Sequence, residues 1–114
     1  MLAVILATAV ATQPALPRTE VPRLGFFAGV AHQCTPGTQR DAFDARVRSM
    51  AAEVQRQHGA DAAFDFAAAF GHGIASAAVS TSSQAPLLGP DFCGDARRTF
   101  EEGAARLGPV PRRQ

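Results

Sequence analysis

The sequence predicts an all-α fold: a small three-helix bundle, with a four-helix bundle as the alternative, stapled by one disulfide and preceded by an N-terminal signal peptide or arm. Three observations lead to this prediction. Apolar residues recur at intervals of three and four over three long stretches, the spacing that places side chains on one face of a helix. Residues that stop and start helices separate these stretches. The only two cysteines, Cys34 and Cys93, stand before the first predicted helix and inside the last.

Length and composition limit the classes of protein to consider. A chain of 114 residues forms at most one domain, with a core near the small end of what folds without a covalent crosslink. The 11 basic and 10 acidic residues give a formal net charge of +1, which provides no global field for attracting nucleic acid or an anionic membrane. Trp and Tyr are absent, which removes the aromatic residues usual in sugar-binding sites. We therefore expect neither nucleic acid nor carbohydrate as a partner.

Residues 1–11 have the features of a secretory signal peptide. They form an unbroken apolar or small run that closes in Ala9-Val10-Ala11, the small-x-small pattern that a signal peptidase recognises. We expect cleavage after Ala11 and a periplasmic or secreted protein. An uncleaved anchor and an ordinary buried segment are the alternatives. As a helix this run reaches only about half of a ~30 Å hydrocarbon core, so membrane contact is expected only if the run stays uncleaved.

Residues 12–33 are predicted to be a proline-rich linker followed by a short apolar arm. Pro14, Pro17 and Pro22 interrupt helices and favour extended conformations. The arm, residues 24–31, is consistent with one or two helical turns or with a buried arm leading into Cys34, and we expect it to cover the end of the bundle. Its larger side chains are candidates for contacting a protein partner: Leu24, Phe26, Phe27 and Val30.

Residues 34–108 are predicted to form the helical domain, which begins with an amphipathic helix. Thr35 or Thr38 is its candidate N-cap. Its predicted core face recurs at intervals of four, three and four residues and consists of Phe43, Val47, Met50 and Val54. Gly59 is the predicted stop and Asp61 the next cap, so the simplest continuation is an antiparallel helical hairpin.

The next helix contains the most apolar stretch outside the N-terminus, residues 64–79. Its predicted core face recurs every four residues and consists of Phe66, Phe70 and Ile74. Ala and Gly occupy most of the other positions, so we expect the most buried element of the fold, with small residues that let neighbouring helices approach closely. Gly71 and Gly73 are expected to kink or fray it.

A third helix is predicted from Asp91, its N-cap, to the stop at Gly108. Its predicted buried stripe consists of Cys93, Ala96, Phe100, Gly103 and Leu107. Arg98, Glu102 and Arg106 are spaced for surface ion pairs, each of which is worth only a few tenths of a kcal/mol. Residues 109–114 are predicted to be a flexible basic tail.

Cys34 and Cys93 are expected to form a disulfide, because an exported small domain is the setting in which such bonds form and stabilise. Parallel first and third helices, in an up-down-up arrangement, would bring both residues to one end of the bundle. Closing a loop of this length stabilises the folded state by about 4 kcal/mol in the loop-closure treatment. The alternative is a redox or metal-binding thiol, but the sequence contains no CxxC pair.

The sequence contains no pattern typical of a catalytic, metal or nucleotide site. His32, His58 and His72 lack the spacing of common metal ligands. GxSxG is absent, so the serine-rich loop offers no activated nucleophile. Glu101 and Glu102 lie at exposed helical positions near Arg, where we expect no reason for a shifted pKa. We therefore expect no enzyme activity, no metal, no cofactor and no small-molecule substrate.

The layout of a small exported helical chain, with a cysteine before the first helix and another opening the last, resembles that of the HdeA-like periplasmic acid-stress chaperones. The residues that carry this resemblance are Cys34, Cys93 and the amphipathic helix that follows Cys34. It implies that protonation of Asp and Glu at low pH loosens the bundle and exposes Phe-rich surface to unfolding client proteins.

The function that we prefer on these grounds is a non-enzymatic interaction or assembly subunit of the cell envelope, with an unidentified protein partner. Its docking surface would be the arm of residues 24–31 or the small-residue face of the helix over 64–79. The acid-stress chaperone is the alternative.

Overall fold

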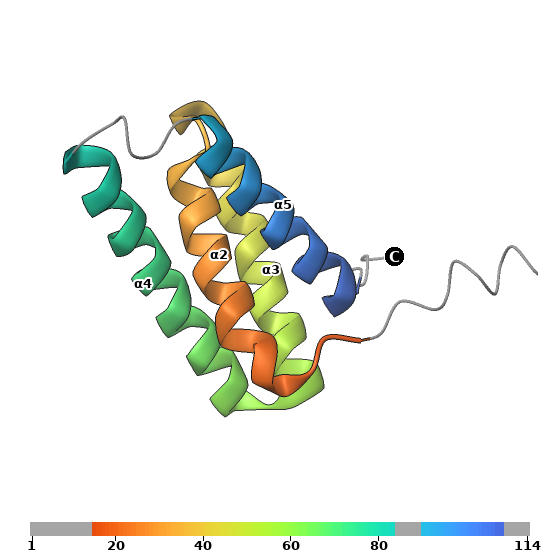
Figure 1. The fold of residues 1–114 in the computed structure, drawn as a ribbon. Coiled ribbons are helices and arrows are strands. Elements are labelled where there is room, and N and C mark those ends of the chain that lie inside the picture. Colours follow the sequence, from red (N-terminus) through yellow and green to blue (C-terminus); the bar gives the residue numbers. More distant parts are fainter. Residues whose placement is uncertain (1–14, 84–89, 109–114) are drawn as a thin grey trace, which may run out of the picture.

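The computed structural model describes residues 15–83 and 90–108, which form a bundle of four long helices (Figure 1). These are α2 (Val21–Gln33), α3 (Arg40–His58), α4 (Ala60–Ser83) and α5 (Pro90–Leu107). Two short 3-10 turns, η1 (Arg18–Glu20) and η2 (Gly37–Gln39), precede α2 and α3. No strand occurs in these residues, so the all-α prediction is confirmed in its four-helix form.

The helices run alternately up and down, so α2 and α4 are parallel to each other and antiparallel to α3 and α5 (Figure 1). The helix α2 packs against all three others, most extensively against α4. The helices α4 and α5 flank α2 on its two sides. The organising element is therefore α2, which the sequence analysis had not identified as a long helix.

The predicted linker and partner arm, residues 12–33, differ most from the structure. Pro22 lies in the first turn of α2, where the missing N–H costs no helical hydrogen bond, so it starts the helix instead of breaking it. Leu24 and Val30 are buried in the core, and Phe26 and Phe27 are partly buried. The prediction of a linker and a short arm is wrong, because residues 21–33 form a long helix of the bundle, and the side chains predicted to contact a partner pack within the protein. The helical unit also begins well before the predicted boundary at residue 34.

The backbones of α2 and α4 touch at glycines. Gly25 and Gly29 lie on the face of α2 that meets α4, and Gly73 lies opposite them. A Cβ on Gly29 would be 2.7 Å from the backbone nitrogen of Ile74, and a Cβ on Gly73 would overlap the carbonyl of Phe26. The predicted close approach through small residues is confirmed, and α4 continues as helix through Gly73.

Most residues of the predicted core faces are buried, and the rest pack at their edge. The buried ones are Val47, Met50, Val54, Phe66, Phe100 and Leu107. Those partly buried are Phe43, Phe70 and Ile74. The helix α4 is nevertheless not the most buried element, because it lies at the side of the bundle and no described helix covers its outer face. An apolar circumference made of Ala and Gly gains little from burial, since those side chains offer little area.

The corner between α2 and α3 is closed by Arg40 and not by the predicted threonine caps. No side chain caps α3, which begins after Gln39. Thr35 instead donates its hydroxyl to the carbonyl of Ala31 at 2.7 Å. The Arg40 guanidinium donates to three carbonyls at the end of α2, those of His32, Gln33 and Thr35. At the other end Gly59, with φ of 99°, stops α3 as predicted.

Cys34 and Cys93 form the predicted disulfide, with a Cα–Cα distance of 5.7 Å. The helices α3 and α5 are parallel and begin at the same end of the bundle, which brings the two cysteines together as expected (Figure 1). Arg97 donates to the carbonyl of Cys34 beside this bond. The disulfide fits an oxidising, exported location.

The glycine contact predicts opposite effects for two Gly→Ala substitutions. Gly29→Ala is expected to lower the free energy of unfolding by about 1–3 kcal/mol, because the added methyl overlaps the backbone of α4. Gly71→Ala is the matched control, because a Cβ there meets nothing within 4 Å, and it is expected to add up to about 1 kcal/mol through helix propensity. Urea unfolding followed by circular dichroism measures both. Equal effects would contradict the close approach of the two helices.

Candidate functional site

The outer face of α4 is an exposed apolar surface. Its apolar residues are Phe64, Ala67, Ala68, Gly71 and Ala75, which recur at helical spacing, and the exposed Asp61 and His72 lie along one edge of it. Phe64 is 73 % exposed and is the only large hydrophobic side chain so exposed among the described residues. Its position follows from the sequence, because Phe64 lies two residues, or about 200° of helical rotation, from the buried Phe66. Periodicity alone did not single out Phe64, because the stretch around it is apolar on most of its circumference.

A groove between α3 and α4 borders this outer face. Its volume is about 240 Å³, and its lining consists of Asp44, Val47, Arg48, Ala51, Phe66, Ala67 and Phe70. Ala67 belongs both to the outer face of α4 and to the lining of the groove, so the groove and the exposed Phe64 lie on adjacent sides of α4. The lining is apolar apart from two charged residues, Asp44 and Arg48.

The two charged residues of the groove differ in how they are engaged. Asp44 accepts a hydrogen bond of 2.7 Å from His32 Nδ1, and this pair joins α3 to α2. The His32 ring also packs edge-on against Phe70, with ring centroids 5.8 Å apart. Arg48 is exposed, and its side chain forms no hydrogen bond or ion pair with any described residue. Arg48 is therefore the charge that the groove offers to a partner.

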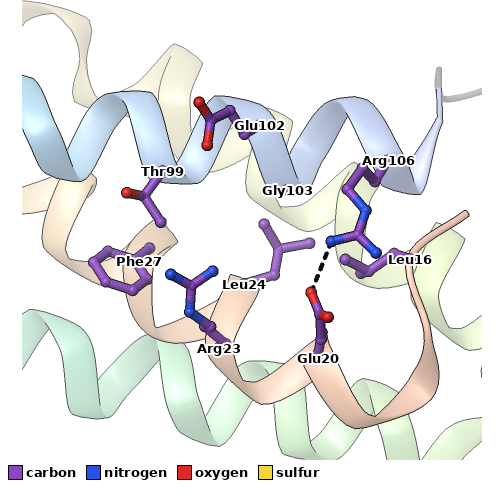
Figure 2. A pocket seen from close by; sticks show the side chains of 9 residues that line it. All are labelled: Leu16, Glu20, Arg23, Leu24, Phe27, Thr99, Glu102, Gly103 and Arg106. Carbon is purple, nitrogen blue, oxygen red and sulfur yellow. Dashed lines mark hydrogen bonds and ion pairs between the residues drawn. The ribbon is translucent and has the colours of Figure 1, made fainter. Parts of the chain in front are cut away.

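A second cavity, of about 120 Å³, lies between α2 and α5 (Figure 2). Arg106 donates to Glu20 at 2.9 Å across one end of it, as the dashed line in Figure 2 shows. Arg23 stacks on Phe27, with its guanidinium carbon 5.2 Å from the ring centroid. The pair of Arg106 and Glu20 ties the start of α2 to the end of α5, so we assign the cavity a structural role.

A third cavity, of about 500 Å³, lies beside the disulfide between α3 and α5. Arg46 donates to both carboxylate oxygens of Glu101, at 2.8 and 2.7 Å, and stacks on Phe100 at 5.0 Å. These hydrogen bonds lower the pKa of Glu101 and raise that of Arg46. The expectation of an unshifted Glu101 pKa is wrong, because the fold brings Arg46 onto this carboxylate from another helix.

The three histidines lie apart in the structure. His32 contacts Asp44, His58 donates to the carbonyl of Leu16 at 3.2 Å, and His72 packs beside Phe26 at 5.5 Å. In residues 15–83 and 90–108, no three His, Cys, Asp or Glu side chains converge as metal ligands would. Each imidazole instead contacts a different part of the bundle.

Glu53 is a buried carboxylate that the sequence analysis did not single out. It accepts hydrogen bonds from the Arg56 guanidinium and from Gln57 Nε2, the latter at 2.7 Å. Gln57 also donates to the carbonyl of Leu107 at 2.9 Å, which links α3 to the end of α5. The hydrogen bonds from Arg56 and then Gln57 lower the pKa of Glu53 to about 2.

Comparisons with known proteins add no assignment to these surfaces. No protein-family model matches the chain, and no significant match was found among curated proteins or solved structures. None of the helices in the described residues is both long enough and apolar enough to cross a membrane.

The lowered pKa of Glu53 predicts a pH-dependent contribution to stability. The pKa of the folded carboxylate is about 2 and the ordinary value for Glu is 4.5, so its contribution to stability is complete above about pH 4.5 and is lost as the pH falls toward 2. Glu53→Gln is therefore expected to destabilise the protein at neutral pH and to differ less from the wild type in acid. Urea unfolding at several pH values measures this, with the exposed Glu102→Gln as the matched control. A difference that stays constant down to about pH 2 would contradict it.

Proposed function

We propose that this protein is a small exported, non-enzymatic subunit of the cell envelope that binds another protein through the outer face of α4. The exposure of Phe64 on a face of small residues, beside an apolar groove, is the observation that carries this proposal. Exposed aromatic side chains on a smooth apolar surface are typical of protein interaction sites. The small residues around Phe64 let a partner approach the helix closely.

The proposed location rests on two features. The disulfide is of the kind found in oxidising compartments, where the periplasm and the secreted space lie. Residues 1–11, which lie outside the described residues, have the composition of a signal peptide. We propose periplasmic or secreted localisation on this basis.

The proposal of a non-enzymatic role is supported by how the polar side chains are used. The ion pairs Arg18–Asp65, Arg46–Glu101 and Arg106–Glu20 each join separate parts of the chain. They hold helices and turns together instead of converging on one cavity. Their arrangement suits a rigid scaffold that presents a surface.

Site-specific photo-crosslinking tests this proposal. A photoreactive residue at Ala68, on the outer face, is expected to give an adduct with an envelope protein, and Phe64→Asp is expected to abolish it. The matched control is Ala105, an exposed position on α5. Equal adducts from Ala68 and Ala105, or none from Ala68, would refute binding through this face.

The intact mass of the same exported product, measured without reduction, reports whether the chain is cleaved after Ala11 and whether the disulfide is formed.

The second candidate function is an acid-stress chaperone. It is favoured by the dependence of the bundle on carboxylates, because Glu20, Asp44, Asp65 and Glu101 each bind a basic side chain from another segment. Protonation removes these contacts, while the disulfide keeps α5 attached to the α2–α3 corner. Loosening then frees apolar side chains for unfolding clients.

An aggregation assay tests the chaperone. At about pH 2 to 3, the protein is expected to reduce light scattering by an acid-unfolding client in proportion to its concentration. An equal mass of an unrelated disulfide-bonded protein is the control. Scattering that is unchanged by the protein would remove this candidate.

A further inference from the structure

We infer that the partner of the outer face of α4 is a second copy of this chain, in a twofold dimer in which Phe64 of each copy fills the groove between α3 and α4 of the other. This inference rests on the proposed function for the outer face and names its partner.

The groove has the size and chemistry to hold a phenyl ring. Its volume is about 240 Å³, and its walls include Val47, Ala51, Phe66 and Phe70. A dry apolar cavity of about 150 Å³ is enough to bind benzene. Phe64 is 73 % exposed in the single chain, so its transfer from water into such a groove is favourable. The same molecule thus carries both an unburied aromatic side chain and an unfilled apolar site.

The positions of Phe64 and the groove allow a closed dimer. Phe64 lies one helical turn from Ala67, which forms the near edge of the groove. Phe64 and the groove lie on adjacent parts of one surface. A twofold axis that passes between them places Phe64 of each copy at the groove of the other, so that each copy contributes both. The exposed Ala68 and Gly71 beside them carry no bulky side chain that would hold the two helices apart. Both contacts form at once, and no unpaired surface remains to extend the assembly.

The charges at the edge of this surface are complementary. Asp61 lies one turn before Phe64, is exposed and forms no hydrogen bond or ion pair within the described part of the chain. Arg48 at the rim of the groove is also unpaired there. The other two nearby carboxylates are already engaged, Asp65 with Arg18 and Asp44 with His32. When Phe64 enters the groove of the second copy, Asp61 approaches that copy's Arg48.

Analytical ultracentrifugation of the exported, disulfide-bonded protein tests the dimer. The molar mass obtained for the wild type is expected to be twice that of the monomer. Phe64→Asp is expected to weaken the dimer by about thirtyfold or more, as for an aromatic hot spot. Ala67→Leu, which fills the groove from its exposed edge, is expected to do the same. Ala105→Asp, on α5, is the matched control and is expected to leave the dimer unchanged. Circular dichroism verifies that each variant is folded.

A charge exchange tests the second contact. Arg48→Asp and Asp61→Arg are each expected to weaken the dimer by about fivefold, the upper range for an exposed ion pair, and the two together are expected to restore it. Failure of the double variant to recover would overturn the proposed orientation. A monomeric wild type would overturn the dimer. If Ala68 then still crosslinks to a different envelope protein in a manner that requires Phe64, the proposed function survives. If it crosslinks to nothing, both fail.

Discussion

The close approach of α2 and α4 determines how the rest of this bundle is arranged. In a square four-helix bundle, parallel helices on a diagonal stay apart, but here Gly25, Gly29 and Gly73 remove the side chains that would separate them. The contact makes α2 the central helix and lets its other sides reach α3 and α5. It also fixes the rotation of α4, so that the side carrying Gly73 faces inward and the side carrying Phe64 faces water.

The two ends of the bundle are fastened by different chemistry. At one end the disulfide joins the α2–α3 corner to the first turn of α5, and Arg40 closes the corner through backbone carbonyls. At the other end Leu16 donates its backbone N–H to the carbonyl of Arg106 at 3.1 Å, and Gln57 connects Glu53 to the end of α5. A core of this size gains limited free energy from apolar burial, so these contacts at the ends add stability where the chain would otherwise fray.

The exposed surface of α4 follows from the same geometry. A helix with small residues on two sides can pack one side against its own bundle and leave the other side exposed to a partner. Gly73 and Ala77 serve the first role, and Ala68 and Gly71 the second. Beside them, Ala51 of α3 and Ala67 of α4 line the groove, and their side chains are too small to fill it. Phe64 and the groove are therefore two results of one packing arrangement.

Local spacing along the chain was enough to predict three features: the helices from Arg40 to Leu107, the stop at Gly59 and the apolar faces of the core. The sequence also predicted the disulfide, because it has the features of a small exported domain and contains only one pair of cysteines. The central position of residues 21–33 could be seen only in the folded protein. The glycines of α2 allow a close helix contact only because α4 lies opposite them. The tertiary structure likewise brought Arg46 onto Glu101 and left Phe64 beside an open groove. Helical periodicity says which residues share a face, but the neighbour that covers that face comes from distant parts of the chain.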